Sequence, residues 1–340
     1  MATLKDVALR AGVGLGTASR VVSGKGAVSP KTLARVRKAI EELEFHPSYA
    51  ARTLMLGSSQ MIGVYIPYLS GTFYTPILKL IYAELRAAGL NMVVGFGIGS
   101  DDERTQAVQG IDFLKERGCD GVLVMSNVLR DEDIAALGPR KSRLVLLNHS
   151  VPSIASQSFT IDHLLGGRLA AQALLREGHR DIAVIAGPRG APDNVERIDG
   201  FLGELAKAGI DTDGLWVAES DFAPRGGWEA ARELAESGYP FTAVFCANDD
   251  MAVGALSYFQ QAGIAVPEQV SVLGYDDTNS AEYTAPRLTT VHMPWTEMTL
   301  SGLNCLLNRC YGMERPVTHD YPVTIALRAS LGRARDIPAA

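Results

Sequence analysis

Short apolar runs alternate with helical segments along most of the chain, and this alternation constrains the fold more than any other feature. Eight runs from residue 61 onward have the length and composition of buried strands: 61–67, 90–96, 119–125, 143–148, 181–187, 241–247, 269–276 and 288–293. Between them lie segments whose apolar residues recur at helical spacing, near 74–88, 101–118, 162–178, 193–209, 224–238, 248–263 and 294–311. Continuous apolar strands separated by helices indicate parallel sheets covered on both faces. Because the pattern occurs twice, we expect two similar α/β lobes with a cleft between them that suits a small molecule.

The first residues of the chain predict a helix-turn-helix. Apolar residues recur at helical spacing over residues 4–11 and again over 15–22, and the glycines between them leave room only for a tight turn. Thr3 is the expected N-cap of the first helix, with Asp6 in the reciprocal capping position. The second helix of such a pair can lie in the major groove of DNA. Its exposed face would carry Leu15, Gly16, Thr17, Ser19 and Arg20, of which arginine can read guanine while hydroxyls suit phosphate oxygens.

A third helix and a linker follow. Ser29 and Pro30 are typical of an N-cap and a first helical residue, and the apolar spacing predicts a helix to about Glu44. Lysines and arginines in its first half favour phosphate contact. Within the linker, residues 49–56 could make two helical turns, which are too short to persist alone in water and would need DNA or a partner chain to form. Leu54 in this segment either docks on the next domain or wedges between base steps in a minor groove.

Net charge separates the head of the chain from its body. Residues 1–60 hold nine lysines and arginines against four acidic residues, whereas the remaining residues carry a net charge of −11. A basic head on an acidic body suggests that the head meets a polyanion and the body does not. The chain has no apolar signal region and no run of 18 apolar residues, so we expect a cytoplasmic protein that does not enter a membrane. The four cysteines are widely spaced in apolar contexts and are expected to be reduced.

Longer segments extend the interpretation to a family. In chain order they are LKDVALRAGVGLGTASRVVSG (4–24), HPSYAARTL (46–54), IGVYIP (62–67), GHRDIAVIAGP (178–188), ERIDGF (196–201), FTAVFCANDDMAVGAL (241–256), VPEQVSVLGYDD (266–277) and PRLTTV (286–291). With these segments in this order, the chain resembles the lactose-repressor/galactose-repressor (LacI/GalR) family of bacterial transcription factors over essentially its whole length.

The resemblance implies a three-part organisation. A three-helix DNA-binding head would occupy residues 1–46, and a hinge helix with its linker residues 47–60. A two-lobed core like that of periplasmic sugar-binding proteins, built from doubly wound parallel sheets, would occupy 61–340. Lobe 1 would comprise about 61–160 and 292–320, and lobe 2 about 161–291 and 321–332. The chain would cross between the lobes near residues 160, 291 and 320.

The resemblance also implies two sets of site residues. Leu15, Gly16 and Arg20 fall where the family reads base edges, Thr17 and Ser19 where it meets phosphates, and Leu54 where it inserts a leucine into the operator. The whole expected DNA-binding set is Leu15, Gly16, Thr17, Ser19, Arg20, Ser29, Arg52 and Leu54. The expected effector-binding set is Tyr74, Asn148, Arg197, Phe222, Asn248, Asp276 and Trp295. The polar members suit the hydroxyls of a polyol, and the aromatic members suit the apolar face of a pyranose ring.

Two glycines depart from the family pattern. Gly14 stands where the family usually has a capping serine, and glycine is also tolerated at an N-cap. Gly16 has no side chain with which to read a base, and it costs about 1 kcal/mol of helix propensity relative to alanine. Selectivity at that operator position must therefore come from another residue or be relaxed.

Other functions fit the sequence less well. The glycines at 95, 97 and 99 follow a strand, but their spacing is not that of a dinucleotide fingerprint. Asp249–Asp250 and Asp276–Asp277 could form a metal site or a glycosidase pair, but the first pair more simply begins a helix and Asp276 suits a ligand hydrogen bond. A transport-type sugar-binding protein would need a signal peptide and no basic head.

We therefore expect a homodimeric repressor that is not an enzyme and has neither a metal nor a cofactor. It would bind a palindromic DNA operator, from which a small sugar or sugar-derivative effector releases it. A purine-type repressor that needs a corepressor remains the alternative.

Overall fold

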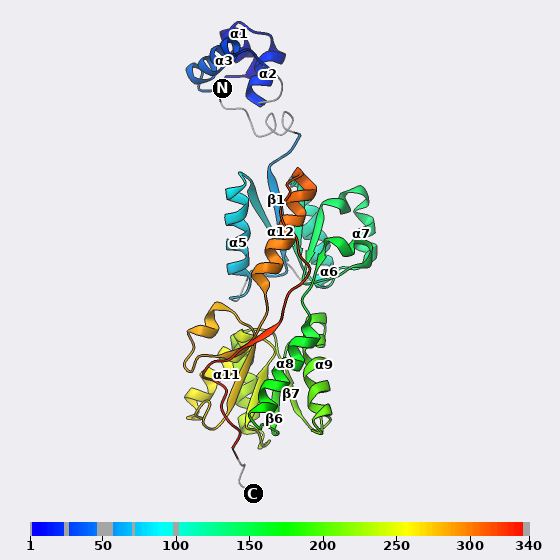
Figure 1. Cartoon of the computed structure of the whole chain (residues 1–340), viewed down its shortest axis with the longest axis vertical. Coiled ribbons are helices and arrows are strands. Elements are labelled where there is room, and N and C mark those ends of the chain that lie inside the picture. Colours follow the sequence, from blue (N-terminus) through cyan, green and yellow to red (C-terminus); the bar gives the residue numbers. More distant parts are fainter. Residues whose placement is uncertain (1, 24–26, 46–56, 70–71, 98–101, 336–340) are drawn as a thin grey trace.

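The computed structural model describes residues 2–23, 27–45, 57–69, 72–97 and 102–335. A small helical head lies at one end of an elongated molecule, two α/β lobes follow along its long axis, and the C-terminus lies at the opposite end (Figure 1). Within the described part of the chain, no helix is long and apolar enough to cross a membrane.

The head has the predicted three helices, α1 (Leu4–Ala11), α2 (Leu15–Ser23) and α3 (Pro30–Glu42). The Thr3 hydroxyl accepts from the Asp6 amide and the Asp6 carboxylate accepts from the Thr3 amide, which confirms the capping box. Ser29 caps α3 as predicted, with Pro30 as the first helical residue. The helix ends two residues before the predicted Glu44 because Glu44 has a left-handed backbone, with φ of 46°.

A five-stranded sheet forms the centre of lobe 1, with all strands parallel in the order β2-β1-β3-β4-β5. Its strands are β1 (Met61–Ile66), β2 (Asn91–Phe96), β3 (Gly121–Met125), β4 (Leu144–Leu147) and β5 (Ser158–Phe159). Its helices are α5 (Tyr74–Ala87), α6 (Glu103–Glu116), α7 (Asp131–Ala136), η1 (Gly138–Arg143), η2 (Pro152–Gln157) and the late α12 (Trp295–Tyr311). Because successive strand residues point to opposite faces, Val64 packs in the core shared with α5 and α12 while Tyr65 packs against α6.

A six-stranded sheet forms lobe 2, in the order β11-β10-β9-β8-β6-β7. Its strands are β6 (Ile182–Ala186), β7 (Trp216–Glu219), β8 (Ala243–Cys246), β9 (Ser271–Asp276), β10 (Thr289–His292) and β11 (Thr324–Ala326). Its helices are α8 (His163–Arg176), α9 (Pro192–Lys207), α10 (Pro224–Glu236), α11 (Asp249–Gln261) and η3 (Asn279–Glu282). The predicted parallel sheets are confirmed, with one exception at the edge of lobe 2, where β11 pairs with β10 in the antiparallel direction.

All eight predicted apolar runs contain a strand, and the sequence interpretation missed three short ones. β5 has only two residues, and β7 alternates half-buried and exposed positions at the sheet edge instead of forming a continuous apolar run. β11 is also short and only partly buried.

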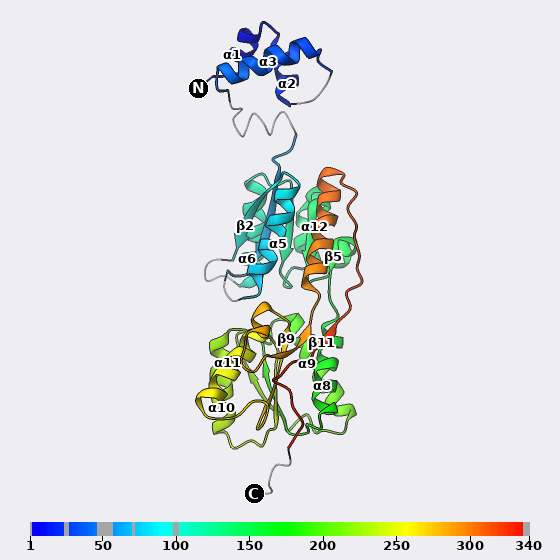
Figure 2. The same cartoon turned by 60° about the vertical axis from the view of Figure 1, so that its left-hand side comes forward.

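The chain passes between the sheets three times, after β5, after β10 and after α12. Figure 2 shows the late α12 against lobe 1, although it follows β10 of lobe 2 in the sequence. A ligand between the lobes would therefore sit beside segments that join both of them.

Candidate functional site

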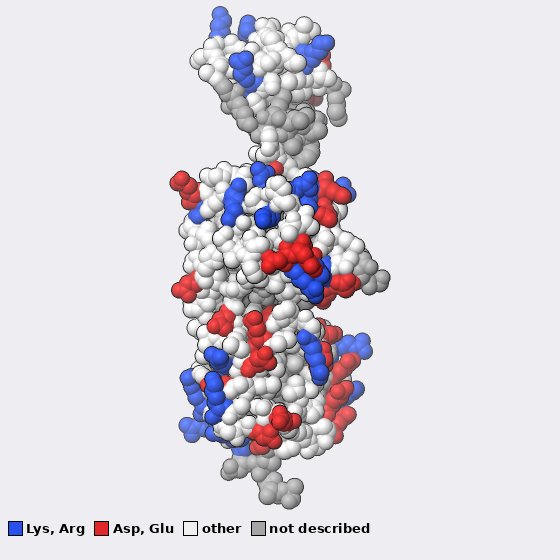
Figure 3. Space-filling view, turned by 90° about the vertical axis from the view of Figure 1, so that its right-hand side faces the viewer, with Lys and Arg blue, Asp and Glu red and all other residues white. Residues whose placement is uncertain are grey.

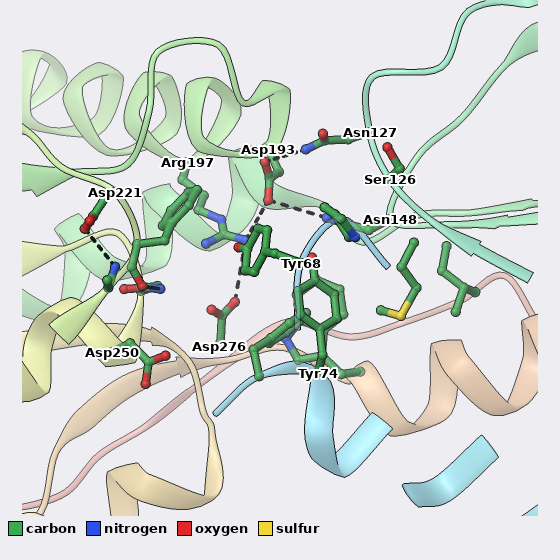
Figure 4. Close-up of a pocket in the computed structure, with 18 of the residues that line it drawn as sticks. Tyr68, Tyr74, Ser126, Asn127, Asn148, Asp193, Arg197, Asp221, Asp250 and Asp276 are labelled. Carbon is green, nitrogen blue, oxygen red and sulfur yellow. Dashed lines mark hydrogen bonds and ion pairs between the residues drawn. The ribbon is translucent and has the colours of Figure 1, made fainter. Parts of the chain in front are cut away.

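A cavity of about 370 Å³ lies between the two lobes, at the carboxyl ends of strands from both sheets. This is the place where open α/β sheets bind ligands. The structure brings all seven residues of the expected effector set into its lining: Tyr74, Asn148, Arg197, Phe222, Asn248, Asp276 and Trp295. Figure 4 shows Asp193 and Asp276 joined to Arg197, with Asn127 and Asn148 directed toward Asp193.

Arg197 is the buried centre of the cavity's polar wall. One guanidinium nitrogen, Nη2, lies 3.1 Å from Asp193 Oδ2 and 3.5 Å from Asp276 Oδ1, while Nη1 donates to the carbonyl of Ala247 at 2.7 Å. Asp193 and Arg197 are one turn apart on α9, so the helix itself aligns this pair. The guanidinium also lies 4.2 Å from the centre of the Tyr275 ring, which orients it further.

Asp276 is held in an unfavourable environment for a charged carboxyl. It is only 6 % exposed. Burial raises the pKa of its carboxyl to about 8, and the nearby Arg197 guanidinium offsets only part of that shift. Its backbone has a φ of 103°, which few residues other than glycine adopt. Strained backbone of this kind tends to occur at ligand sites.

Two buried polar atoms in the cavity lining lack a hydrogen-bond partner among the described residues. They are Asp276 Oδ1 and the indole nitrogen Nε1 of Trp295. A buried polar atom left in this way costs about 1–3 kcal/mol. One atom is a carboxyl oxygen and the other an N–H donor, so a ligand that carries hydroxyl groups would satisfy both.

Aromatic side chains form the apolar wall of the cavity. Phe73 packs edge-to-face on Tyr74 and on Trp295, with ring centroids 5.0 and 4.8 Å apart, and Tyr68 packs on Tyr74 at 5.3 Å. Burial raises the pKa of Tyr74 well above its usual value, so its hydroxyl stays neutral. Phe222 adds a further ring to the lining from lobe 2.

Asn248 lines the cavity, but its amide is already used within the protein. Its Oδ1 accepts from the Met251 amide at the start of α11, and its Nδ2 donates to the Phe222 carbonyl. The residue therefore caps α11 and positions Phe222, beside any contact it makes to a ligand.

Hydrogen bonds between four pairs of described residues join the lobes around the cavity; one pair is Asn148 and Asp193, with Asn148 Nδ2 3.5 Å from Asp193 Oδ2. The Thr72 hydroxyl donates to Asp250 Oδ1 at 2.7 Å, and Asn127 Nδ2 donates to Asp193 Oδ1 at 2.8 Å. Asn148 Oδ1 and His163 Nε2 lie 2.6 Å apart. Each pairs a residue of lobe 1 with one of lobe 2, so the relative position of the lobes depends on the same side chains that surround the cavity.

Sequence reasoning missed several of these residues. Asp193 could have been found from its spacing of four residues to Arg197 on one helix. Asp250 does lie in the first turn of α11, as expected, but its carboxylate also accepts from Thr72 across the cleft. No local pattern marks Tyr68, Thr72 or Asn127, which lie in loops of lobe 1.

The head exposes much of its expected DNA-binding set. Leu15, Gly16 and Arg20 on α2 are exposed, while Thr17 and Ser19 are partly buried. The exposed Ser29 also caps α3. Arg52, Leu54 and the predicted hinge helix lie outside the described residues.

The two unusual glycines of the head differ in their surroundings. The Gly14 carbonyl accepts from the amides of Thr17 and Ala18 and so begins the hydrogen bonding of α2. A Cβ atom added at Gly16 would meet no atom within 4 Å, so packing of the described head does not require a glycine there.

A helix-turn-helix head joined to a two-lobed core with an interlobe cavity defines the class of ligand-responsive DNA-binding regulators. In the part of the chain that the structure describes, no group of three or more histidine, cysteine or acidic side chains could hold a metal ion. The polar cavity therefore stands as the candidate ligand site, and the head as the candidate DNA-binding element.

Comparisons with known proteins agree with this class. Residues 3–48 match the family model described as bacterial regulatory proteins of the lacI family, and residues 171–331 match a periplasmic binding protein-like domain. The HTH-type transcriptional regulator AscG of Escherichia coli is 36% identical over 88% of this chain and 89% of its own. Further relatives at 30–32% identity carry the names GalR and PurR. The chain belongs to the LacI family of bacterial transcriptional regulators, and these relatives are regulators and not enzymes.

Solved structures extend the likeness to the fold. A LacI-family transcriptional regulator from Burkholderia phymatum is 48% identical, with a TM-score of 0.77 over 81% of this chain and all of that one. The Lac repressor dimer bound to operator and the anti-inducer ONPF is 28% identical, with a TM-score of 0.82 over 97% of this chain and 98% of that one. The chain is thus a DNA-binding transcriptional regulator with the two-lobed core of its family.

Proposed function

We propose that the protein is a dimeric repressor of a carbohydrate-utilisation operon and that a neutral sugar or sugar derivative releases it from a palindromic operator. The observation that carries this proposal is the pair of buried atoms in the cavity lining that make no hydrogen bond to a described residue, Asp276 Oδ1 and Trp295 Nε1. A polyol offers each of them a hydrogen bond, and its ring can stack on the aromatic wall. The likeness to the Lac repressor dimer on its operator supports the dimer and the DNA partner.

The charge of the cavity favours an uncharged ligand. Among the described lining residues, three aspartates besides Asp276, at positions 193, 221 and 250, stand against the single cation of Arg197. Arg197 is already engaged by Asp193 and Asp276. An anionic sugar, such as a phosphate or a sugar acid, would meet an excess of negative charge in a buried site, which is costly.

A purine corepressor is the second candidate. The aromatic wall would stack equally well on a nucleobase, and some relatives carry the name PurR. The polar groups favour the sugar, because vicinal hydroxyls match an arginine, an asparagine and an aspartate better than a purine edge does.

Control of DNA binding would follow from linkage between the two sites. Ligand binding between the lobes changes the balance of the interlobe hydrogen bonds and hence the disposition of the lobes. That disposition sets how the two linkers of a dimer meet, and so the equilibrium between DNA-competent and incompetent forms. A coupling free energy of about 1–3 kcal/mol is typical of such switches. Because its family consists of bacterial DNA-binding regulators, we also propose that the protein acts in the cytoplasm.

A ligand screen tests this proposal. The purified full-length protein is melted in the presence of neutral sugars, sugar acids, sugar phosphates and purines, and each compound that raises the Tm is then measured by calorimetry. We expect a neutral sugar or sugar derivative to raise the Tm and to weaken operator binding. Stabilisation by a purine together with stronger operator binding would establish the second candidate instead.

A further inference from the structure

The end of lobe 1 that lies next to the head is basic, although the chain beyond residue 60 is acidic. Six exposed cations gather there from the last turns of α5, α6 and α12 and from η1, and we call them the basic edge: Arg86, Arg117, Arg140, Lys141, Arg143 and Arg309. None of the six forms an ion pair with another described residue. The exposed acidic residues near these helix ends, Asp112, Glu116 and Glu314, are fewer, and Asp112 pairs with Lys115. Figure 3 shows lysine and arginine side chains at this end of the core, below the segment that leads to the head.

The strand register explains why these residues face the head. In a parallel sheet all strands begin at the same edge, and helix C-termini lie at that edge. Ile62 pairs with Gly121, and Val122 pairs with Leu144, which directly follows η1. Arg143 is therefore only two strand spacings, about 10 Å, from the point where the chain enters lobe 1 from the head.

Asp120 holds the incoming linker against this edge. Its carboxylate accepts from the Ser58 hydroxyl at 2.6 Å and from the amides of Ser59 and Gln60 at 3.0 and 2.8 Å. The Tyr311 hydroxyl, at the end of α12, donates to the same carboxylate at 2.9 Å. The linker thus reaches the core at a position fixed by hydrogen bonds, beside the basic edge.

A hollow in this edge provides a concave basic surface. It has a volume of about 410 Å³, and its charged lining residues are Lys115, Arg140 and Arg143 together with Glu116 and Asp120. Lys115 pairs with Asp112, whereas Arg140 and Arg143 form no ion pair with a described residue. Concave surfaces lined by arginine suit phosphate groups, because the guanidinium presents several donors in one plane.

We propose that the basic edge of lobe 1 binds the phosphate backbone of the DNA that the head occupies. Twelve residues, 46–57, separate the last described residue of the head from the segment held by Asp120, so the edge stays within about 40 Å of the head even at full extension. Contacts to phosphates do not distinguish one base sequence from another. The contact therefore adds affinity and salt dependence to DNA binding without changing sequence preference.

Two triple variants of the full-length protein test the proposal. R140Q/K141Q/R143Q removes three cations from the basic edge. R176Q/R333Q/R335Q removes three exposed cations from the opposite end of the core, where the Ala334 amide donates to the Glu177 carbonyl. The two variants have equal net charge. A difference in their DNA affinity therefore depends on where the positive charge was removed.

The measurement is the affinity for a random-sequence duplex over a range of KCl concentrations, by fluorescence anisotropy. For R140Q/K141Q/R143Q we expect roughly ten-fold weaker binding at low salt, and a slope of log K against log salt that is shallower by about 0.9 for each phosphate that the variant no longer binds. The control variant should keep the wild-type slope, as should R140K/R143K, in which the charge is conserved. Wild-type slopes in both triple variants, or equal changes in both, would overturn the proposal. Wild-type slopes in both variants would also be observed if the basic edge bound an acidic protein instead of DNA. Failure of the wild-type protein to bind DNA at all would contradict the family function, which is a separate result.

Discussion

Arg197 and Asp276 face each other inside the interlobe cavity, with 3.5 Å between Nη2 of the first and Oδ1 of the second, and both are nearly inaccessible to solvent. The guanidinium is further satisfied by Asp193 and by the Ala247 carbonyl, whereas Asp276 Oδ1 has no hydrogen bond to a described residue. The pair is therefore asymmetric, since the arginine makes several hydrogen bonds while Asp276 Oδ1 makes none.

Replacing Asp276 by asparagine should remove the effector response. The side-chain amide of asparagine has the same shape as the carboxyl, but its nitrogen can only donate, so one oxygen that could accept a ligand hydroxyl is lost. We expect effector binding to weaken by about 2 kcal/mol or more, which is about 30-fold, while operator binding stays near wild type. Calorimetry measures the first quantity and a mobility-shift titration the second. Effector affinity equal to that of the wild type would remove Asp276 from the site.

The same carboxyl predicts a pH dependence of stability in the ligand-free protein. Burial raises the pKa of Asp276 to about 8, above the value of 3.8 expected in the unfolded chain. Between these values folding takes up a proton, so this residue makes the free energy of unfolding fall as the pH rises from about 4 to about 8. In Asp276→Asn this contribution is absent, and the variant's Tm should decline less than the wild type's over that range. Parallel Tm profiles for the two proteins would contradict the assignment.

Arg20 should carry the base preference of the head. It is the only arginine or lysine on α2, and it is exposed. Arg20→Ala should cost about 1–3 kcal/mol per half-site and abolish the preference for operator. Non-specific binding should remain and fall steeply with salt. Mobility shifts on operator and on random DNA check this, and undiminished discrimination would show that another residue reads the bases.

Leu54 lies outside the described residues, and its role stays a prediction. If it wedges into the centre of a palindrome, Leu54→Ala should weaken specific binding and reduce DNA bending while effector affinity is unchanged. If it packs on the core instead, the variant should have a lower Tm with bending unaltered. Bending measured by FRET, together with a melting curve, separates the two roles.

Much of the fold follows from local patterns, because a buried parallel strand such as β3 is apolar at every position. The antiparallel β11 and the edge strand β7 lack that pattern, so only the assembled sheet identifies them. In the cavity, family resemblance led to residues that the structure does bring together, such as Arg197 and Trp295.

The interlobe bond of Thr72 to Asp250 illustrates what could not be foreseen. Its partners are 178 residues apart in the chain and meet only because the lobes lie together. The structural role of Asn248, whose amide caps α11 and bonds to the Phe222 carbonyl, likewise becomes apparent only in the folded chain.

Reciprocal linkage tests the central claim most directly. By thermodynamic necessity, a ligand that weakens operator binding must itself bind more weakly to the operator-bound protein, by the same factor. Calorimetry measures the affinity of the effector for the free protein and for the protein saturated with operator DNA. We predict roughly 5- to 150-fold weaker effector binding in the operator complex, the range typical of such coupling, and an equal factor when operator affinity is measured with and without effector. Equal effector affinities for free and operator-bound protein would contradict control of DNA binding through the interlobe cavity.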